Sequence, residues 1–98
     1  MIPVIVSDDA EADIHAAREF YDNSSEGLGE YFCSSLLADL DRLRMTAGVH
    51  RKAYRQYHRA LCRAFPYGIF YTVDKDVAVV WAVVDLRRDT AWIEEHLG

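Results

Sequence analysis

RAFPYGIFYTVDKDVAVVWAVVDLRRD, residues 63–89, is the stretch that decides the fold of this chain. It holds two runs of apolar residues, 67–73 and 77–86, which are joined by a polar turn at 74–76. Because the runs are apolar at nearly every position, they indicate strands that are covered on both faces in the middle of a sheet. The second run ends in Arg87 and Arg88, so we expect positive charge at one edge of the sheet, where an anion or an acidic partner would bind.

The rest of the chain predicts a pair of helices, with one strand before it and one strand after it in the sequence. Residues 4–6 are β-branched, and apolar residues then recur at helical spacing in two segments with a short polar break between them. A break this short predicts an antiparallel helical hairpin. In order, we expect a strand at 4–6, a helix from Ser7 or Asp8 to a break at 23–25, a helix from Glu26 or Gly27 to Gly48, a loop at 46–56, strands at 57–64, 67–73 and 77–86, and a short helix at 89–97.

This order predicts an α+β fold, β-α-α-β-β-β, in which the helical hairpin packs on a small curved antiparallel sheet and a short helix ends the chain. The 98 residues fit a single domain, 1–98. The chain has no apolar run long enough for a transmembrane helix, and its first residues lack the features of a signal peptide. We therefore expect a cytoplasmic protein that does not contact a membrane.

Metal and cofactor chemistry is not expected. Cys33 and Cys62 lie far apart in the sequence, and the four histidines are scattered, so no zinc-binding spacing is present. The chain also lacks a glycine-rich phosphate loop, because the segment from Gly27 to Gly29 has neither a preceding strand nor a following lysine. Both cysteines are interpreted as small core residues.

Charge is strongly segregated along the chain. Residues 1–41 contain ten acids and one base, whereas residues 42–63 contain seven bases and no acid. The formal net charge of −5 argues against non-specific binding to nucleic acid by the whole protein. The basic segment still leaves room for a specific anion site.

Three stretches resemble the RelE/ParE family of toxins from bacterial type II toxin–antitoxin systems. They are AEADIHAAREFYD at 10–22 followed by GLGEYF at 27–32, RAFPYGIFY at 63–71, and VVDLRRDTAW at 83–92. Together they cover most of the chain, and the segments at 27–29 and 65–68 resemble the ParE-like branch more closely. The resemblance implies a growth inhibitor that a cognate antitoxin protein holds silent.

The family resemblance implies more than one activity. ParE-like members poison DNA gyrase without known catalytic residues, and we expect gyrase as the target here. The alternatives are a ribosome-dependent mRNA endonuclease of the RelE type, which needs no metal, and an inactive member that only binds antitoxin. The RelE-like site contains a tyrosine late in the sequence. The corresponding position in this chain falls near Ile93, whose side chain cannot transfer a proton. His50 and His58 could transfer a proton, although the strand phase favours a position for His58 that is packed inside the protein.

Basic side chains are the strongest functional candidates, because they could bind phosphates of a nucleic acid or acidic side chains of a partner. The alternative is that they only keep the surface solvated. Arg63 and Arg87 match arginines of the RelE-like site. Aromatic residues of the strands, Trp81 included, are interpreted as core. We assign target or anion binding to Arg51, Lys52, Arg55, Arg59, Arg63, Arg87 and Arg88, and antitoxin binding to Tyr21, Leu28, Phe32 and Trp92, with no catalytic residue assigned.

Overall fold

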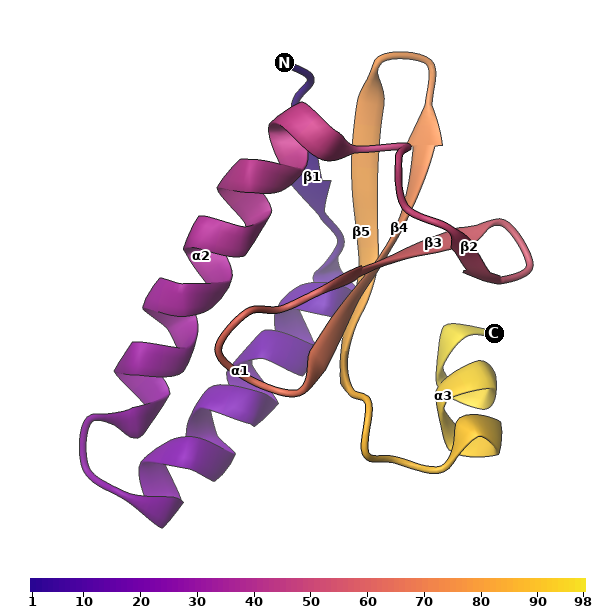
Figure 1. Ribbon diagram of the computed structural model, residues 1–98. Coiled ribbons are helices and arrows are strands. Elements are labelled where there is room, and N and C mark those ends of the chain that lie inside the picture. Colours follow the sequence, from indigo (N-terminus) through magenta and orange to yellow (C-terminus); the bar gives the residue numbers. More distant parts are fainter.

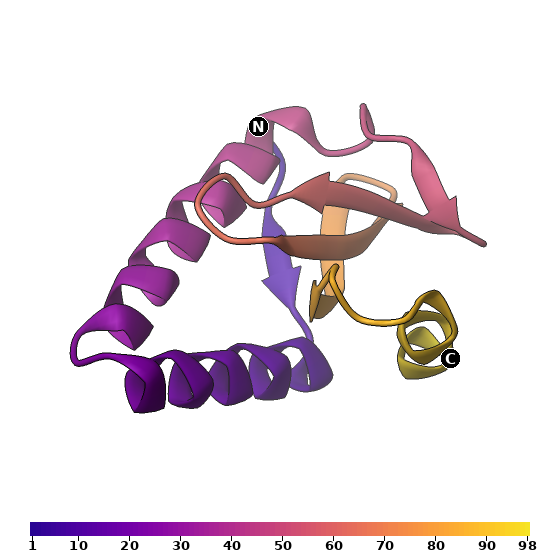
Figure 2. The same cartoon turned by 60° about the horizontal axis from the view of Figure 1, so that its bottom comes forward.

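A computed structural model describes all residues of the chain, 1–98, and it has the expected α+β fold (Figure 1). Two long helices form a hairpin on one face of a five-stranded sheet, and a short third helix lies across the sheet from them (Figure 2). The elements are β1 Val4–Val6, α1 Asp8–Ser24, α2 Leu28–Thr46, β2 Lys52–Tyr54, β3 Tyr57–Leu61, β4 Tyr67–Asp74, β5 Val77–Asp85 and α3 Thr90–Leu97.

Local signals explain where the two helices of the hairpin begin. The side chain of Ser7 caps α1 by accepting a hydrogen bond from the amide of Ala10 at 3.1 Å. Between the helices, Gly27 has the left-handed conformation, with φ 82°, that reverses the chain. Asp22 then accepts a hydrogen bond from the amide of Gly29 at 2.9 Å, so the end of α1 caps the start of α2.

The sheet order is β1-β5-β4-β3-β2, and it is mixed. β3, β4 and β5 pair antiparallel as expected, and β2 also pairs antiparallel with β3, but β1 pairs with β5 in parallel. The expectation of a purely antiparallel sheet was therefore wrong at this edge. The direction of β1 relative to β5 is set only when the whole chain has folded. The three residues of β1 therefore could not reveal the parallel pairing.

Two strand boundaries also differ from the expectation. Residues 46–56 were expected to be a loop, yet 52–54 form β2, which pairs with β3 across a tight turn in which Arg55 has φ 50°. The prediction was wrong because a polar edge strand lacks the apolar alternation by which strands are recognised. β3 ends at Leu61 rather than at residue 64, because the amide of Cys62 already bonds to the carbonyl of Tyr67 to close the next turn.

The core has two parts, one on each face of the sheet. The larger lies under the helical hairpin, and its most enclosed side chains are Tyr71, Phe32, Leu43, Ile69 and Val80. The smaller consists of Phe70, Ala82 and Val84, and is covered by Tyr57, Leu86 and the α3 residues Ile93 and Leu97.

A bulge in β5 changes the expected position of one aromatic residue. Phe70 pairs with Ala82, while Tyr71 pairs with Val80, so Trp81 has no partner in β4. Its side chain is 42% exposed and donates a hydrogen bond to Thr72 Oγ1 at 2.8 Å. The interpretation of Trp81 as a core residue was therefore wrong, whereas Tyr67, Phe70 and Tyr71 are buried as predicted.

Candidate functional site

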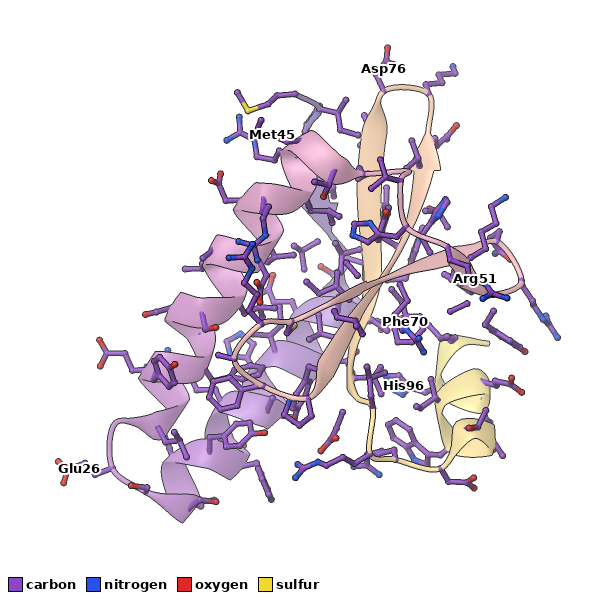
Figure 3. The ribbon with its side chains drawn as sticks, in the orientation of Figure 1. Glu26, Met45, Arg51, Phe70, Asp76 and His96 are labelled. Atoms are coloured by element: carbon purple, nitrogen blue, oxygen red, sulfur yellow. The ribbon has the colours of Figure 1, made fainter.

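A group of basic side chains gathers on the β2–β3 hairpin. Arg51, Lys52 and Arg59 line a depression of about 250 Å³, and all three are exposed. The backbone holds them together, because the amide of Arg59 bonds to the carbonyl of Arg51 at 3.3 Å. None of the three forms an ion pair. Figure 3 shows Arg51 on the side of the molecule remote from the helical hairpin.

Arg55 lies at the turn of the same hairpin and is oriented by aromatic rings. Its guanidinium carbon lies 5.1 Å from the centre of the Tyr54 ring, and the rings of Tyr54 and Tyr57 are nearly parallel at 6.5 Å. Tyr57 also contacts the end of the chain, because its hydroxyl donates a hydrogen bond to the carbonyl of Leu97 at 3.2 Å. Arg55 therefore extends the basic group of Arg51, Lys52 and Arg59 toward the C-terminus.

Arg63 is exposed and lies beyond the end of β3, where helix α2 positions its backbone. Asp39 is only 6% exposed; its carboxylate pairs with Arg42 and accepts a hydrogen bond from the amide of Arg63 at 3.4 Å. The same carboxylate lies beside Cys62. Burial, and then Asp39, raise the pKa of the Cys62 thiol to about 12, which makes it a poor nucleophile.

The arginine pair after β5 divides into two different environments. Arg87 is bound by Asp85 through two hydrogen bonds, at 3.0 Å from Nε and 2.7 Å from a terminal nitrogen. The hydrogen bond from Arg87 lowers the pKa of the Asp85 carboxyl below its usual value. Arg88 forms no ion pair and places its guanidinium 3.9 Å from the centre of the Trp92 ring. Arg88 is therefore the cation of this pair with its charge free to meet an anion.

Two of the expected antitoxin contacts are core residues. Tyr21 and Phe32 are 8% and 1% exposed, and their rings stack at 5.3 Å inside the hairpin. They cannot contact a partner directly in this conformation, and Leu28 is half-buried against the same core. Only Trp92, at 38% exposed, presents its ring to solvent. The helical repeat could not show which residues of the hairpin face inward, and the exposed large apolar residues of the hairpin are instead Phe20, Tyr31, Leu37 and Met45.

The histidines that could transfer a proton are engaged inside the molecule. His50 Nδ1 lies 2.6 Å from the hydroxyl of Tyr71, and His58 Nδ1 lies 2.7 Å from the carbonyl of His50. His58 also stacks on the Tyr71 ring at 5.0 Å, which agrees with the packed position favoured by strand phase. Burial and the neighbouring His58 lower the pKa of His50. His58 also lines a notch of about 530 Å³ together with Lys52 and Trp81.

The basic groups can bind anions, but the side chains around them do not form a nucleophile with an adjacent base. Ile93, at the place of the late tyrosine, packs on the smaller core. No group of three or more His, Cys, Asp or Glu side chains is arranged to hold a metal ion. None of the helices combines the length and apolar character needed to cross a membrane.

Comparison with known proteins gives the family of the chain. The family described as "ParE toxin of type II toxin-antitoxin system, parDE" matches residues 4–90. A solved structure described as a chromosomal ParDE TA system from P. aeruginosa has a similar fold, with a TM-score of 0.75 at 12% identity over 87% of this chain and 96% of that one. No curated protein sequence matches significantly. Because the family match spans nearly the whole chain, this protein belongs to the ParE toxin family of type II toxin–antitoxin systems.

Proposed function

We propose that this toxin inhibits DNA gyrase in the cytoplasm by binding to it, without cleaving a substrate, and that a cognate antitoxin neutralises it. Family membership supports the class of activity, and the observation that carries the mechanism is the group of unpaired cations Arg51, Lys52 and Arg59. These cations lie without a carboxylate partner, so their charge is available for acidic side chains or for phosphates of gyrase-bound DNA.

A second function, cleavage of mRNA on the ribosome, is favoured by one specific observation. The notch beside the basic group is lined by both Lys52 and His58. A histidine next to a cation is the pairing that metal-independent cleavage of a phosphodiester needs, because one group accepts a proton while the other stabilises charge. His58 already uses Nδ1 to contact the carbonyl of His50, so only its Nε2 would remain for such chemistry.

The test measures gyrase supercoiling and transcript cleavage with the same set of purified variants. For gyrase inhibition, we expect Arg51→Ala and Arg59→Ala each to weaken inhibition in steps, since a charged contact contributes about 1–3 kcal/mol. His58→Gln should inhibit as well as the unchanged protein. Arg44→Ala is the matched control, because Arg44 is paired with Asp41 on α2 and lies outside the basic group.

The opposite result would support the endonuclease. Loss of a general base typically lowers a rate by ~10²–10⁴-fold, whereas loss of one binding contact costs much less. Cuts at defined mRNA positions that vanish in His58→Gln, together with normal supercoiling by gyrase, would contradict the proposed function.

A further inference from the structure

Two hollows adjoin at the β2–β3 hairpin, because Lys52 lines both of them. The smaller is the basic depression of about 250 Å³ that Lys52 forms with Arg51 and Arg59. The larger is the notch of about 530 Å³ that His58 and Trp81 also line. Figure 1 shows that the β2–β3 hairpin points away from the β4–β5 turn, and the notch takes residues from both. Each hollow is comparable in size to small-molecule sites, which are usually about 300–1,000 Å³.

The notch contains an aromatic ring that the sheet leaves uncovered. The bulge in β5 gives Trp81 no partner in β4, and the indole N–H is already bonded to Thr72 Oγ1 at 2.8 Å. This hydrogen bond holds the indole in place and satisfies its one polar atom, so the ring offers a ligand only its apolar surface. A planar aromatic ligand can stack on such a surface.

Two side chains of opposite charge at the notch have no ionic partner in the protein. Lys52 and Asp74 both line it, and neither forms an ion pair with the other or with any other residue. Arg51 and Arg59 in the adjoining depression are also unpaired. The notch therefore offers a carboxylate together with an aromatic ring, and the depression offers cations.

A ligand that uses all of these groups combines a planar ring, an anion and hydrogen-bond donors. Nucleotides supply the ring and the anion. Among the common bases, only guanine carries two adjacent donors, N1–H and N2–H, on its base-pairing edge, and these match the two oxygens of an ionised carboxylate such as Asp74. Adenine and cytosine place an acceptor nitrogen beside their amino group, and a carboxylate repels that acceptor.

We propose that the notch and the basic depression together bind a free guanine nucleotide. The base stacks on Trp81 and donates two hydrogen bonds to Asp74, and the phosphates bind Arg51, Lys52 and Arg59. This binding site goes beyond the proposed function, because it does not depend on whether gyrase is the target of the toxin.

The charge of the molecule favours a single nucleotide over a nucleic-acid strand. The formal net charge is −5, so the phosphates of a strand that extend beyond the depression would be repelled. The β4–β5 turn next to the notch carries Asp74 and Asp76 with only Lys75 between them. The cations of the depression are instead gathered in one place, which suits the adjacent phosphates of a nucleoside diphosphate.

Calorimetry with the purified full-length protein measures the affinities for GDP, ADP and guanosine. We expect GDP to bind at least about tenfold more tightly than ADP, because ADP leaves Asp74 without its donors. Guanosine should bind about tenfold or more weakly than GDP, because it lacks the phosphates. Arg59→Ala should weaken the binding of GDP to a similar extent and leave the binding of guanosine unchanged.

Two carboxylate variants test how the base is recognised. Asp74→Asn should reduce the preference for GDP over ADP to within about threefold, because an amide offers one donor and one acceptor and can pair with the adenine edge. Asp76→Asn is the matched control and should keep the preference. Figure 3 shows Asp76 at the tip of the same turn, and it lines neither hollow.

Fluorescence locates the base. The chain has two tryptophans, so Trp92→Phe leaves Trp81 as the only one, and GDP should quench its emission with the affinity that calorimetry gives. Heat of binding without quenching would place the nucleotide elsewhere and overturn the site. Failure to bind GDP, or equal affinities for GDP and ADP, would also overturn it. A short guanine-containing DNA strand that binds at least about tenfold more tightly than GDP would assign the hollows to nucleic acid instead.

Discussion

A single carboxylate, Asp39, holds the start of the β3–β4 turn against α2. It is the one charged side chain among the buried residues, and it joins Arg42 on its own helix to the amide of Arg63 on the next layer. A buried charge remains stable only when its hydrogen bonds are satisfied. Asp39 therefore has a structural role, and Arg63 owes the position of its backbone to it.

Replacing this carboxylate should reduce stability far more than replacing its exposed neighbour. We expect Asp39→Ala to lower the free energy of unfolding by about 1–3 kcal/mol, because the Arg63 amide and Arg42 lose their acceptor. Asp41 pairs with Arg44, but its side chain is 75% exposed, so Asp41→Ala should change the free energy by only about 0–1 kcal/mol. Urea denaturation followed by circular dichroism measures both, and equal losses would contradict the structural role of Asp39.

At the scale of elements, the helical hairpin depends on two glycines with different requirements. Gly27 needs its left-handed backbone, and nothing lies within 4 Å of the place where a Cβ would be. Gly29 needs empty space, because a Cβ there would lie 2.6 Å from the carbonyl oxygen of Arg18 and would also meet Asp22. The close approach of α1 and α2 is therefore possible only without a side chain at Gly29.

This difference predicts losses of stability of different size for the two substitutions. Gly29→Ala should destabilise the protein by about 1–3 kcal/mol, since the helices must separate or strain to admit one methyl group. Gly27→Asn should cost only a few tenths to about 1 kcal/mol, because asparagine tolerates the left-handed region and has open space there. Thermal unfolding of the two variants compares them directly. A Gly29→Ala protein as stable as Gly27→Asn would show that the helix contact is looser than described.

At the scale of the whole molecule, a polar junction joins the end of the hairpin layer to the sheet. The Tyr71 hydroxyl accepts a hydrogen bond from the amide of Gly48 at 3.0 Å and contacts His50, while His58 stacks on the same ring. Tyr71 is fully buried, so these contacts connect the exit from α2 with the centre of the sheet. Because burial and His58 lower the pKa of His50, protonation should work against the folded state.

The stability of the whole protein should therefore depend on pH through His50. The unfolded chain binds the proton more readily, so stability is complete above the ordinary histidine pKa of about 6.5 and falls as the pH decreases below it. His50→Asn keeps a polar group near Tyr71 but cannot titrate, and it should reduce this fall. Unfolding free energies at pH 7.5 and pH 5.5 give the difference. His15→Asn, at an exposed position on α1, is the matched control for the replacement of a histidine by asparagine.

The sequence by itself determined the layers, the family and every element except β2. Helix starts at Ser7 and near Gly27, and the two apolar runs that became β4 and β5, follow from caps, turns and periodicity within a few residues. These signals are local, so the chain displays them without its tertiary contacts. β2 is a polar strand at the edge of the sheet, so its local sequence carries no such signal and the strand could not be recognised.

Only the tertiary structure decided which side chains are available for function. Spacing could not show that Arg87 is neutralised by Asp85 while Arg88 is not, or that Tyr21 and Phe32 face inward. The parallel pairing of β1 with β5 requires residues far apart in the chain to meet. Strand register, burial and ion pairing are properties of the closed chain, because each depends on a partner that sequence spacing does not specify.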